Sequence, residues 1–140
     1  MSKTCLMVGL IVAAGPALAE DAPETARSVE GVRAVEAHWQ KAFLGGDAAY
    51  LDTLLDPAYV SVGHAGNARP KAEIIALSKK VAEKKMTPQP PDHPANIVVR
   101  DNAAVVSDSG SGDTSVDVFY YADGRWHAWY SQHTAVQPAK

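Results

Sequence analysis

The chain has 140 residues, a formal net charge of −3 and 46% hydrophobic residues, which is typical of one small globular domain. The sequence has no basic stripe of the kind that binds nucleic acid. It also has no basic amphipathic helix that would lie on a membrane surface. We therefore expect neither nucleic acid nor a membrane as a partner.

The first 19 residues have the three parts of a secretory signal peptide. Lys3 gives a basic start, residues 5–14 form an apolar run, and Ala17-Leu18-Ala19 is an A-x-A cleavage site. The apolar run is too short to span a membrane, which takes about 20 residues. We predict cleavage after Ala19 and a periplasmic or secreted product. The only cysteine, Cys5, leaves with the signal peptide, so the product has no disulfide.

Three amphipathic helices are expected in the first half of the remaining chain. Residues 20–28 read as a frayed start, and an apolar stripe that includes Val32, Val35 and Trp39 then indicates a helix that ends at Gly45-Gly46. Asp47 is the expected cap of a short second helix, which Asp56-Pro57 ends. Pro70 suits the first position of a third helix.

The second half reads as antiparallel sheet. A short strand at 59–62 precedes the third helix, and a proline-rich connector at 87–94 follows that helix. Beyond the connector, residues 97–100 and 103–107 form one hairpin around Asp101-Asn102, and residues 114–121 and 125–136 form the last. The four residues at 137–140 are a tail. The domain therefore covers residues 29–136.

The last hairpin contains most of the aromatic side chains, and its register decides which of them are buried. A two-residue turn would pair Ala122 with Arg125, whereas a three-residue loop would pair Tyr121 with Arg125. We prefer the three-residue loop because it gathers apolar side chains on one face, and a one-residue shift would invert that face. The predicted core face consists of Val116, Val118, Tyr120, Trp126, Ala128 and Tyr130, and extends to Gln132.

The opposite face would carry polar residues together with two aromatic ones. An exposed sheet rarely presents such a pair to solvent. We therefore expect a homodimer through this outer face, with an interface that contains Phe119, His127, Trp129 and His133.

The order of these elements resembles the nuclear transport factor 2-like superfamily. The motifs that carry the likeness span residues 29–136; they are residues 39–43 with 46–48, 55–60, 116–118, 123–126 and 131–134. The chain looks closest to SnoaL-like and ketosteroid isomerase-like members, and to uncharacterised exported bacterial ones. One departure is Ala68-Arg69-Pro70 where members often have Ser or Thr as a helix cap. The resemblance implies an α+β fold: three N-terminal helices packed on a strongly curved, mostly antiparallel sheet, a cone-shaped α+β barrel with a pocket at one end.

Three functions are compatible with such a cone. The first is binding of a small apolar or aromatic molecule in a pocket lined by Trp39, Tyr59, Tyr120, Tyr130 and Gln132, without catalysis. The second is an acid–base isomerase, cyclase or dehydratase. The third is a structural homodimer with a filled cone. The superfamily includes proteins of all three kinds, so the resemblance does not choose among them.

An enzyme of the second kind would need a base and hydrogen-bond donors in an apolar cavity. The predicted core face supplies no carboxylate, because Asp117 falls on the opposite face. His64, just after the first strand, could be the base, with Tyr59 or Tyr130 as donor. The favoured interpretation of His64 is nevertheless an exposed turn residue, and that of the two tyrosines is packing in the wall or core. No metal-ligand spacing and no cofactor motif is found in the sequence.

Overall fold

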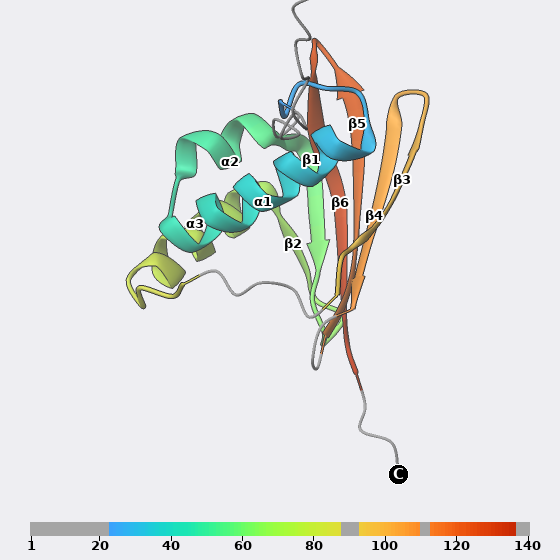
Figure 1. The fold of residues 1–140 in the computed structure, drawn as a ribbon. Helices are drawn as coiled ribbons and strands as arrows, with labels where there is room; N and C mark the ends of the chain where they lie inside the picture. Colours follow the sequence, from blue (N-terminus) through green and yellow to red (C-terminus); the bar gives the residue numbers. More distant parts are fainter. Residues whose placement is uncertain (1–22, 88–92, 110–112, 137–140) are drawn as a thin grey trace, which may run out of the picture.

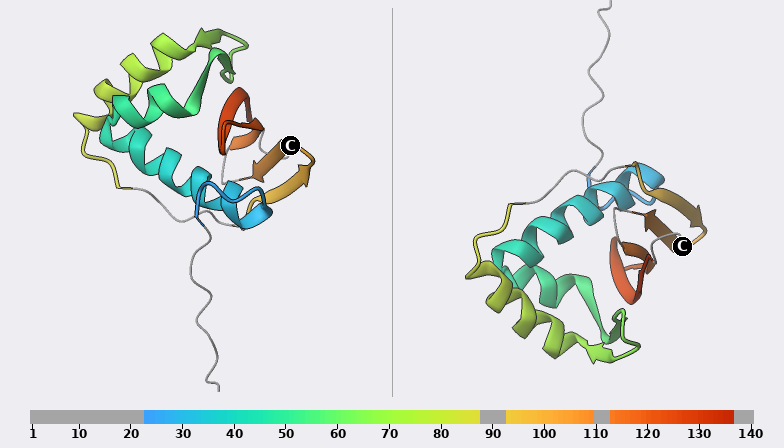
Figure 2. Two further views of the ribbon diagram at one scale, coloured as in Figure 1. Left: turned by 90° about the horizontal axis from the view of Figure 1, so that it is seen from above. Right: turned by 90° about the horizontal axis from the view of Figure 1, so that it is seen from below.

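The computed structural model describes residues 23–87, 93–109 and 113–136. The predicted signal peptide, the centre of the proline-rich connector and the tail lie outside these residues. The described chain folds into three helices on one side of a six-stranded sheet (Figure 1, Figure 2). The elements are α1 (Val29–Gly45), α2 (Ala48–Leu54), β1 (Leu55–Val62), β2 (Ala68–Pro70), α3 (Lys71–Ala82), β3 (Asn96–Arg100), β4 (Ala103–Ser109), β5 (Asp113–Ala122) and β6 (Arg125–Ala135). The predicted α+β architecture is confirmed.

Local sequence signals explain where the first two helices begin and end. The Ser28 hydroxyl accepts the Gly31 N–H at the start of α1, and Gly46, with φ of 72°, ends that helix in the left-handed conformation. Asp47 caps α2 by accepting the Tyr50 N–H at 3.0 Å. These glycine and aspartate boundaries are as the sequence predicts. In the described part of the chain, none of the helices has the length and apolar character needed to cross a membrane.

The sheet has the strand order β2-β1-β6-β5-β4-β3. Every neighbouring pair is antiparallel except β1 and β6, which are parallel. The last hairpin, β5 and β6, therefore forms the middle of the sheet, beneath α1. Its residues line both the core and the cavity described below.

The preferred register of this hairpin is wrong near the turn. Ala122 pairs with Arg125, so the turn has only two central residues, Asp123 and Gly124. Their φ angles are 51° and 77°, which is the left-handed pair of a type I′ turn. The backbone of this turn matches the twist of the two strands. The longer loop is preferred from the sequence because it gathers more apolar side chains on one face, but that number does not determine the geometry of a turn.

A β-bulge on β6 then changes which side chains face inward. Phe119 pairs with Ala128, but the preceding residue, Val118, pairs with Tyr130, so β6 contains one extra residue at this point. Before the bulge, β6 directs Trp126 and Ala128 toward the helices; after it, the inward residues are Ser131 and His133.

The predicted faces must be corrected accordingly. Trp126 and Ala128 are buried as expected, with 2% and 0% of their surface exposed. Phe119, predicted outside, is fully buried, and Asp117 shares its inward face. The residues wrongly assigned to the core face are Val116, Val118, Tyr120, Tyr130 and Gln132.

The segment before α1 is bound to the core rather than frayed. The Trp126 indole N–H donates to the Ala26 carbonyl at 2.9 Å, and the Tyr121 hydroxyl donates to the Thr25 carbonyl at 2.7 Å. The Tyr50 hydroxyl donates to the Glu24 carboxylate at 3.0 Å. Residues 24–26 thus cover one end of the hairpin core.

Candidate functional site

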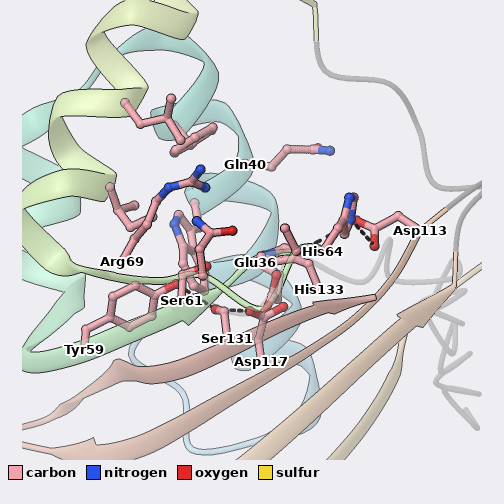
Figure 3. A pocket seen from close by; sticks show the side chains of 17 residues that line it. Glu36, Gln40, Tyr59, Ser61, His64, Arg69, Asp113, Asp117, Ser131 and His133 are labelled. Carbon is pink, nitrogen blue, oxygen red and sulfur yellow. Dashed lines mark hydrogen bonds and ion pairs between the residues drawn. The ribbon is translucent and has the colours of Figure 1, made fainter. Parts of the chain in front are cut away.

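A pocket of about 520 Å³ opens between α1, α3 and the strands β1, β2, β5 and β6 (Figure 3). Its apolar wall consists of Trp39, Phe43, Ile74 and Leu77. Trp39 packs edge-on against Tyr59 at 6.0 Å and against Phe119 at 5.8 Å between ring centroids, so the wall is continuous with the core. The volume lies in the range of small-molecule sites, about 300–1,000 Å³. A cone filled by its own side chains would leave no such cavity.

Two carboxyl groups, Glu36 of α1 and Asp117 of β5, converge on the inner end of this pocket (Figure 3). Burial raises the pKa of Glu36 well above its usual range, and the neighbouring charges of Asp117 and Asp108 raise it further. The Oε1 atom of Glu36 is buried and has no hydrogen-bond partner among the described residues. An unpartnered buried oxygen is costly, so this atom is available to a bound molecule.

A hydrogen-bond chain leads to the second carboxyl group. The Tyr59 hydroxyl donates to Ser131 Oγ at 2.7 Å, and the Ser131 hydroxyl donates to Asp117. Burial raises the pKa of Asp117, whereas the Ser131 hydrogen bond and the nearby His133 lower it. Burial also raises the pKa of Tyr59 to about 12, so its hydroxyl keeps its proton near neutral pH.

The two carboxyl groups therefore have different environments. Asp117 receives a hydrogen bond that stabilises its ionised form, while Glu36 receives none. Two close carboxyl groups do not readily ionise together. This geometry favours the proton on Glu36 over Asp117, which provides one acid and one base in the same cavity.

Three side chains form a polar cluster at the pocket mouth. Asp113 Oδ1 lies 2.9 Å from His64 Nε2, and Asp113 Oδ2 lies 3.5 Å from His133 Nδ1. The two imidazole centroids are 6.3 Å apart, with the rings edge to face. This cluster joins the loop after β1 to the central hairpin. No group of three or more metal-ligating side chains suited to an ion occurs within residues 23–87, 93–109 and 113–136.

Solved structures from several bacteria have the same arrangement of helices and strands. A nuclear transport factor 2-like protein from Cytophaga hutchinsonii superimposes with a TM-score of 0.63 at 18% identity, over 76% of this chain and 97% of the other. The chain has the nuclear transport factor 2-like fold. Proteins of this fold from Silicibacter pomeroyi and Pseudomonas putida, both of unknown function, give TM-scores of 0.61 and 0.59 at 16% and 12% identity. They cover 75% and 77% of this chain, and 92% and 86% of their own.

Sequence comparison adds nothing to this likeness. No protein-family model matches the chain. No curated protein matches it significantly either. At these identities the solved structures establish the fold alone, so the function of this nuclear transport factor 2-like domain must be argued from its own pocket.

The fold brings some of the predicted site residues together and separates others. Trp39, Tyr59 and His64 line the pocket, with Tyr59 at its inner end and His64 at its mouth. Tyr130 is on the other side of the sheet, 37% exposed, where its hydroxyl donates to Gln132 Oε1 at 2.9 Å.

Tyr120 is also on that outer side, where it stacks on His127 with centroids 5.1 Å apart and donates to Asp56. The expectation that Tyr120, Tyr130 and Gln132 line the pocket is therefore wrong. The register of the last hairpin is the physical cause in each case.

The predicted interface residues also divide between the two faces. Trp129, 55% exposed, and His127 lie on the outer face, as expected. Phe119 is fully buried against Trp39, and His133 is part of the cluster at the pocket mouth. The assignment of Phe119 and His133 to an outer interface is wrong, because the bulge and the two-residue turn place both on the inner face.

Sequence reasoning missed most of the polar residues that line the pocket, among them Glu36, Arg69, Asp117 and Ser131. A signal for Glu36 exists: it lies four residues after Val32 and three before Trp39, within the buried stripe of α1. Asp117 and Ser131 become visible only with the correct register. Arg69 stands where the superfamily often has a helix-capping region, and this departure marks a residue that faces the pocket.

Proposed function

We propose that the pocket binds a small, largely apolar molecule and that the domain transfers protons on it, as an isomerase, cyclase or dehydratase does. The apolar wall of Trp39, Phe43, Ile74 and Leu77 suits a hydrocarbon or aromatic body. The observation that carries the proposal is the pair Glu36 and Asp117 at the inner end of the same cavity.

Each carboxyl group has a role that follows from its environment. The Asp117 carboxylate removes a proton from a carbon beside a substrate carbonyl. The C–H electron pair forms a C=C bond, and the carbonyl π electrons move to oxygen, which Glu36 hydrogen-bonds or protonates. If the substrate has a C=C bond next to that carbon, Asp117 returns the proton to the far end of the conjugated system, which shifts the double bond and isomerises the substrate. If it has a hydroxyl on the neighbouring carbon, the carbonyl re-forms, the C–O bond breaks, and the hydroxyl takes the proton from Asp117 and leaves as water.

Tyr59 and Ser131 are positioning residues in this scheme. Because the Ser131 hydroxyl donates to Asp117, one carboxylate oxygen is fixed and the other is available to the substrate. Tyr59 in turn fixes the Ser131 hydroxyl through its 2.7 Å hydrogen bond. An oriented base needs no rearrangement when the proton moves, which lowers the barrier to the reaction.

Binding without catalysis fits this pocket less well. Burial of an unpartnered carboxyl oxygen costs roughly 1–3 kcal/mol, which a pocket for passive binding has no need to incur. His64, the base expected from the sequence, lies 2.9 Å from Asp113 at the mouth, and half of its side chain is exposed, at 50%. The proposed base is therefore Asp117 rather than His64.

Deuterium exchange tests the proposal without knowledge of the natural substrate. Small aromatic and cyclic ketones, such as β-tetralone, are incubated with the protein in D₂O, and deuterium uptake at the carbon beside the carbonyl is followed by mass spectrometry. Asp117→Asn should slow protein-dependent exchange by about 100-fold or more. Glu36→Gln should slow it less, because an amide can still donate a hydrogen bond.

A matched control is Asp101→Asn, since Asp101 lies in the exposed β3–β4 turn with φ of 50°, a conformation that asparagine accepts. This variant should exchange at the wild-type rate. Exchange that is no faster with the wild-type protein than in buffer, or that persists in Asp117→Asn, would refute the proposal.

We also propose that the domain acts outside the cytoplasm. The support is the basic start, apolar run and A-x-A site of residues 1–19. The test is the intact mass of the protein recovered from the periplasm or medium. A chain that begins at Glu20 is expected, and a full-length chain retained in the cytoplasm would contradict export.

A further inference from the structure

Arg69 is a cation at the pocket that no described side chain neutralises. It belongs to β2, where it is the register partner of Ser61, and it is only partly exposed. The ion pair and the histidine–carboxylate contacts among the described residues involve other side chains, namely Lys71, His38, His64 and His133. A guanidinium group that lines a cavity without a carboxylate partner is available to an anion.

One amide side chain accompanies Arg69. Asn67 lines the same pocket, and Figure 3 shows Arg69 well away from Asp117. A Cβ atom built at Gly63 would lie 3.1 Å from Asn67 Oδ1 and 3.7 Å from Arg69 Nη1, so the glycine leaves space in which both groups lie close together. Amide and guanidinium N–H groups are the donors that bind a carboxylate.

The pocket is therefore divided by charge. Its inner end carries Asp117, whose carboxylate would repel an anion, beside Glu36, on which the proton is favoured, and its mouth carries Asp113 between two histidines. Arg69 is the part of the lining that can attract negative charge without a competing partner. An anionic substrate would thus enter in one orientation, with its charged group at Arg69.

We propose that the substrate is an apolar or aromatic carboxylic acid whose carboxylate binds Arg69, with Asn67 beside it. This inference rests on the proposed function, which identifies the end of the substrate that reacts. The apolar body of the substrate lies along the apolar wall, and its carbonyl group reaches Asp117 and Glu36. The guanidinium fork fits carboxylate and phosphate alike. A carboxylate is favoured because a phosphate dianion carries a second negative charge, which the single fixed cation would leave unpaired in a cavity that also holds Asp113 and Asp117.

Binding of matched probes tests the inference. The probes are trans-cinnamate and cinnamamide, which share a shape and differ in charge, with phenyl phosphate as a separate arm. Calorimetry at low salt should give an affinity for cinnamate at least tenfold higher than for cinnamamide. Arg69→Gln should abolish this preference and leave the amide affinity unchanged, whereas Arg69→Lys should retain part of it. The control Arg125→Gln changes an exposed arginine at the start of β6 and should behave as wild type.

Several results would overturn the inference. They are equal affinities for the acid and the amide, no binding of either probe, a preference that survives in Arg69→Gln with an unchanged melting curve, and tighter binding of phenyl phosphate than of cinnamate. The same titration on Asp117→Asn, read together with deuterium exchange by the wild type, separates the two proposals. If Asp117→Asn still prefers cinnamate but the wild type exchanges no deuterium, the Arg69 site is supported and the catalytic proposal is refuted. If the wild type exchanges deuterium but shows no preference for cinnamate, the catalytic proposal is supported and the Arg69 site is refuted.

Discussion

Ser131→Ala is the sharpest test of the hydrogen-bond chain in the pocket. Ser131 is 1% exposed, and its hydroxyl accepts from Tyr59 and donates to Asp117. Alanine removes a single oxygen atom, so the packing of the strand changes little. The substitution leaves the Tyr59 hydroxyl without its acceptor and Asp117 without its donor.

The expected loss of stability follows from these two contacts. A hydrogen bond to a charged group contributes about 1.5–3 kcal/mol, and a neutral one contributes about 1 kcal/mol. Since the two bonds share one hydroxyl and their contributions overlap, we expect the free energy of unfolding to fall by about 2–4 kcal/mol near neutral pH.

The loss should depend on pH in a defined direction. The pKa of Asp117 is raised in the fold, so its burial costs stability as the pH rises from the unfolded pKa through the folded one. The Ser131 hydrogen bond lowers that pKa, so its removal raises the pKa further and enlarges the cost. The difference between wild type and Ser131→Ala should therefore be larger at pH 8 than at pH 4. The acid limb of any Asp117-dependent reaction should also move to higher pH.

Urea denaturation followed by tryptophan fluorescence, repeated at both pH values, measures this difference. The control is Ser115→Ala, on the same face of β5 as Asp117 but opposite His133. It should cost less than about 0.5–1 kcal/mol. A loss below about 1 kcal/mol in Ser131→Ala, or the same loss at both pH values, would refute the proposed chain.

Three further predictions concern the two faces of the sheet. Trp126→Ala should lower the free energy of unfolding by about 3–5 kcal/mol, because the ring is buried and its N–H donates to Ala26. Trp129→Ala on the outer face should lower it by less than about 1 kcal/mol. Equal losses in urea titrations would show that the two faces are wrongly assigned. Light scattering should detect a homodimer that Trp129→Ala weakens, and a monomeric wild type at micromolar concentration would exclude the outer interface. Tyr120→Phe removes the hydrogen bond that lowers the pKa of Asp56. The resulting loss of stability should be present at pH 7 and should fade as the pH falls through the pKa of Asp56 in the folded protein. An undiminished loss near pH 2 would contradict this.

Most of the elements and several of their boundaries could be read from local sequence, although β1 begins at Leu55, four residues before the predicted strand. Asp47 caps a helix because its carboxylate accepts the N–H three residues ahead, and Gly46 ends a helix because it adopts positive φ without strain. The β3–β4 turn at Asp101-Asn102 and the order of helices and strands follow from similar signals, and they were sufficient to predict the fold. Each signal involves residues within a few positions of one another.

The candidate site could not be read in the same way. The wrong register of the last hairpin moved Asp117 out of the predicted pocket and Tyr130 into it. The deciding features were a two-residue turn at Asp123-Gly124 and one extra residue in β6. Both alter the face of every side chain beyond them, so a local error of one residue changes the whole lining.

What the sequence determined by itself is therefore the three helices with the caps of the first two, most of the strands, and a core that includes Trp39 and Trp126. Tertiary structure alone decided that Glu36, Asp117 and Arg69 line one cavity. These three residues come from a helix, a central strand and an edge strand, and the sheet register with the packing of α1 brings them together. Contacts between distant segments depend on how whole faces pack, and no local pattern contains that information.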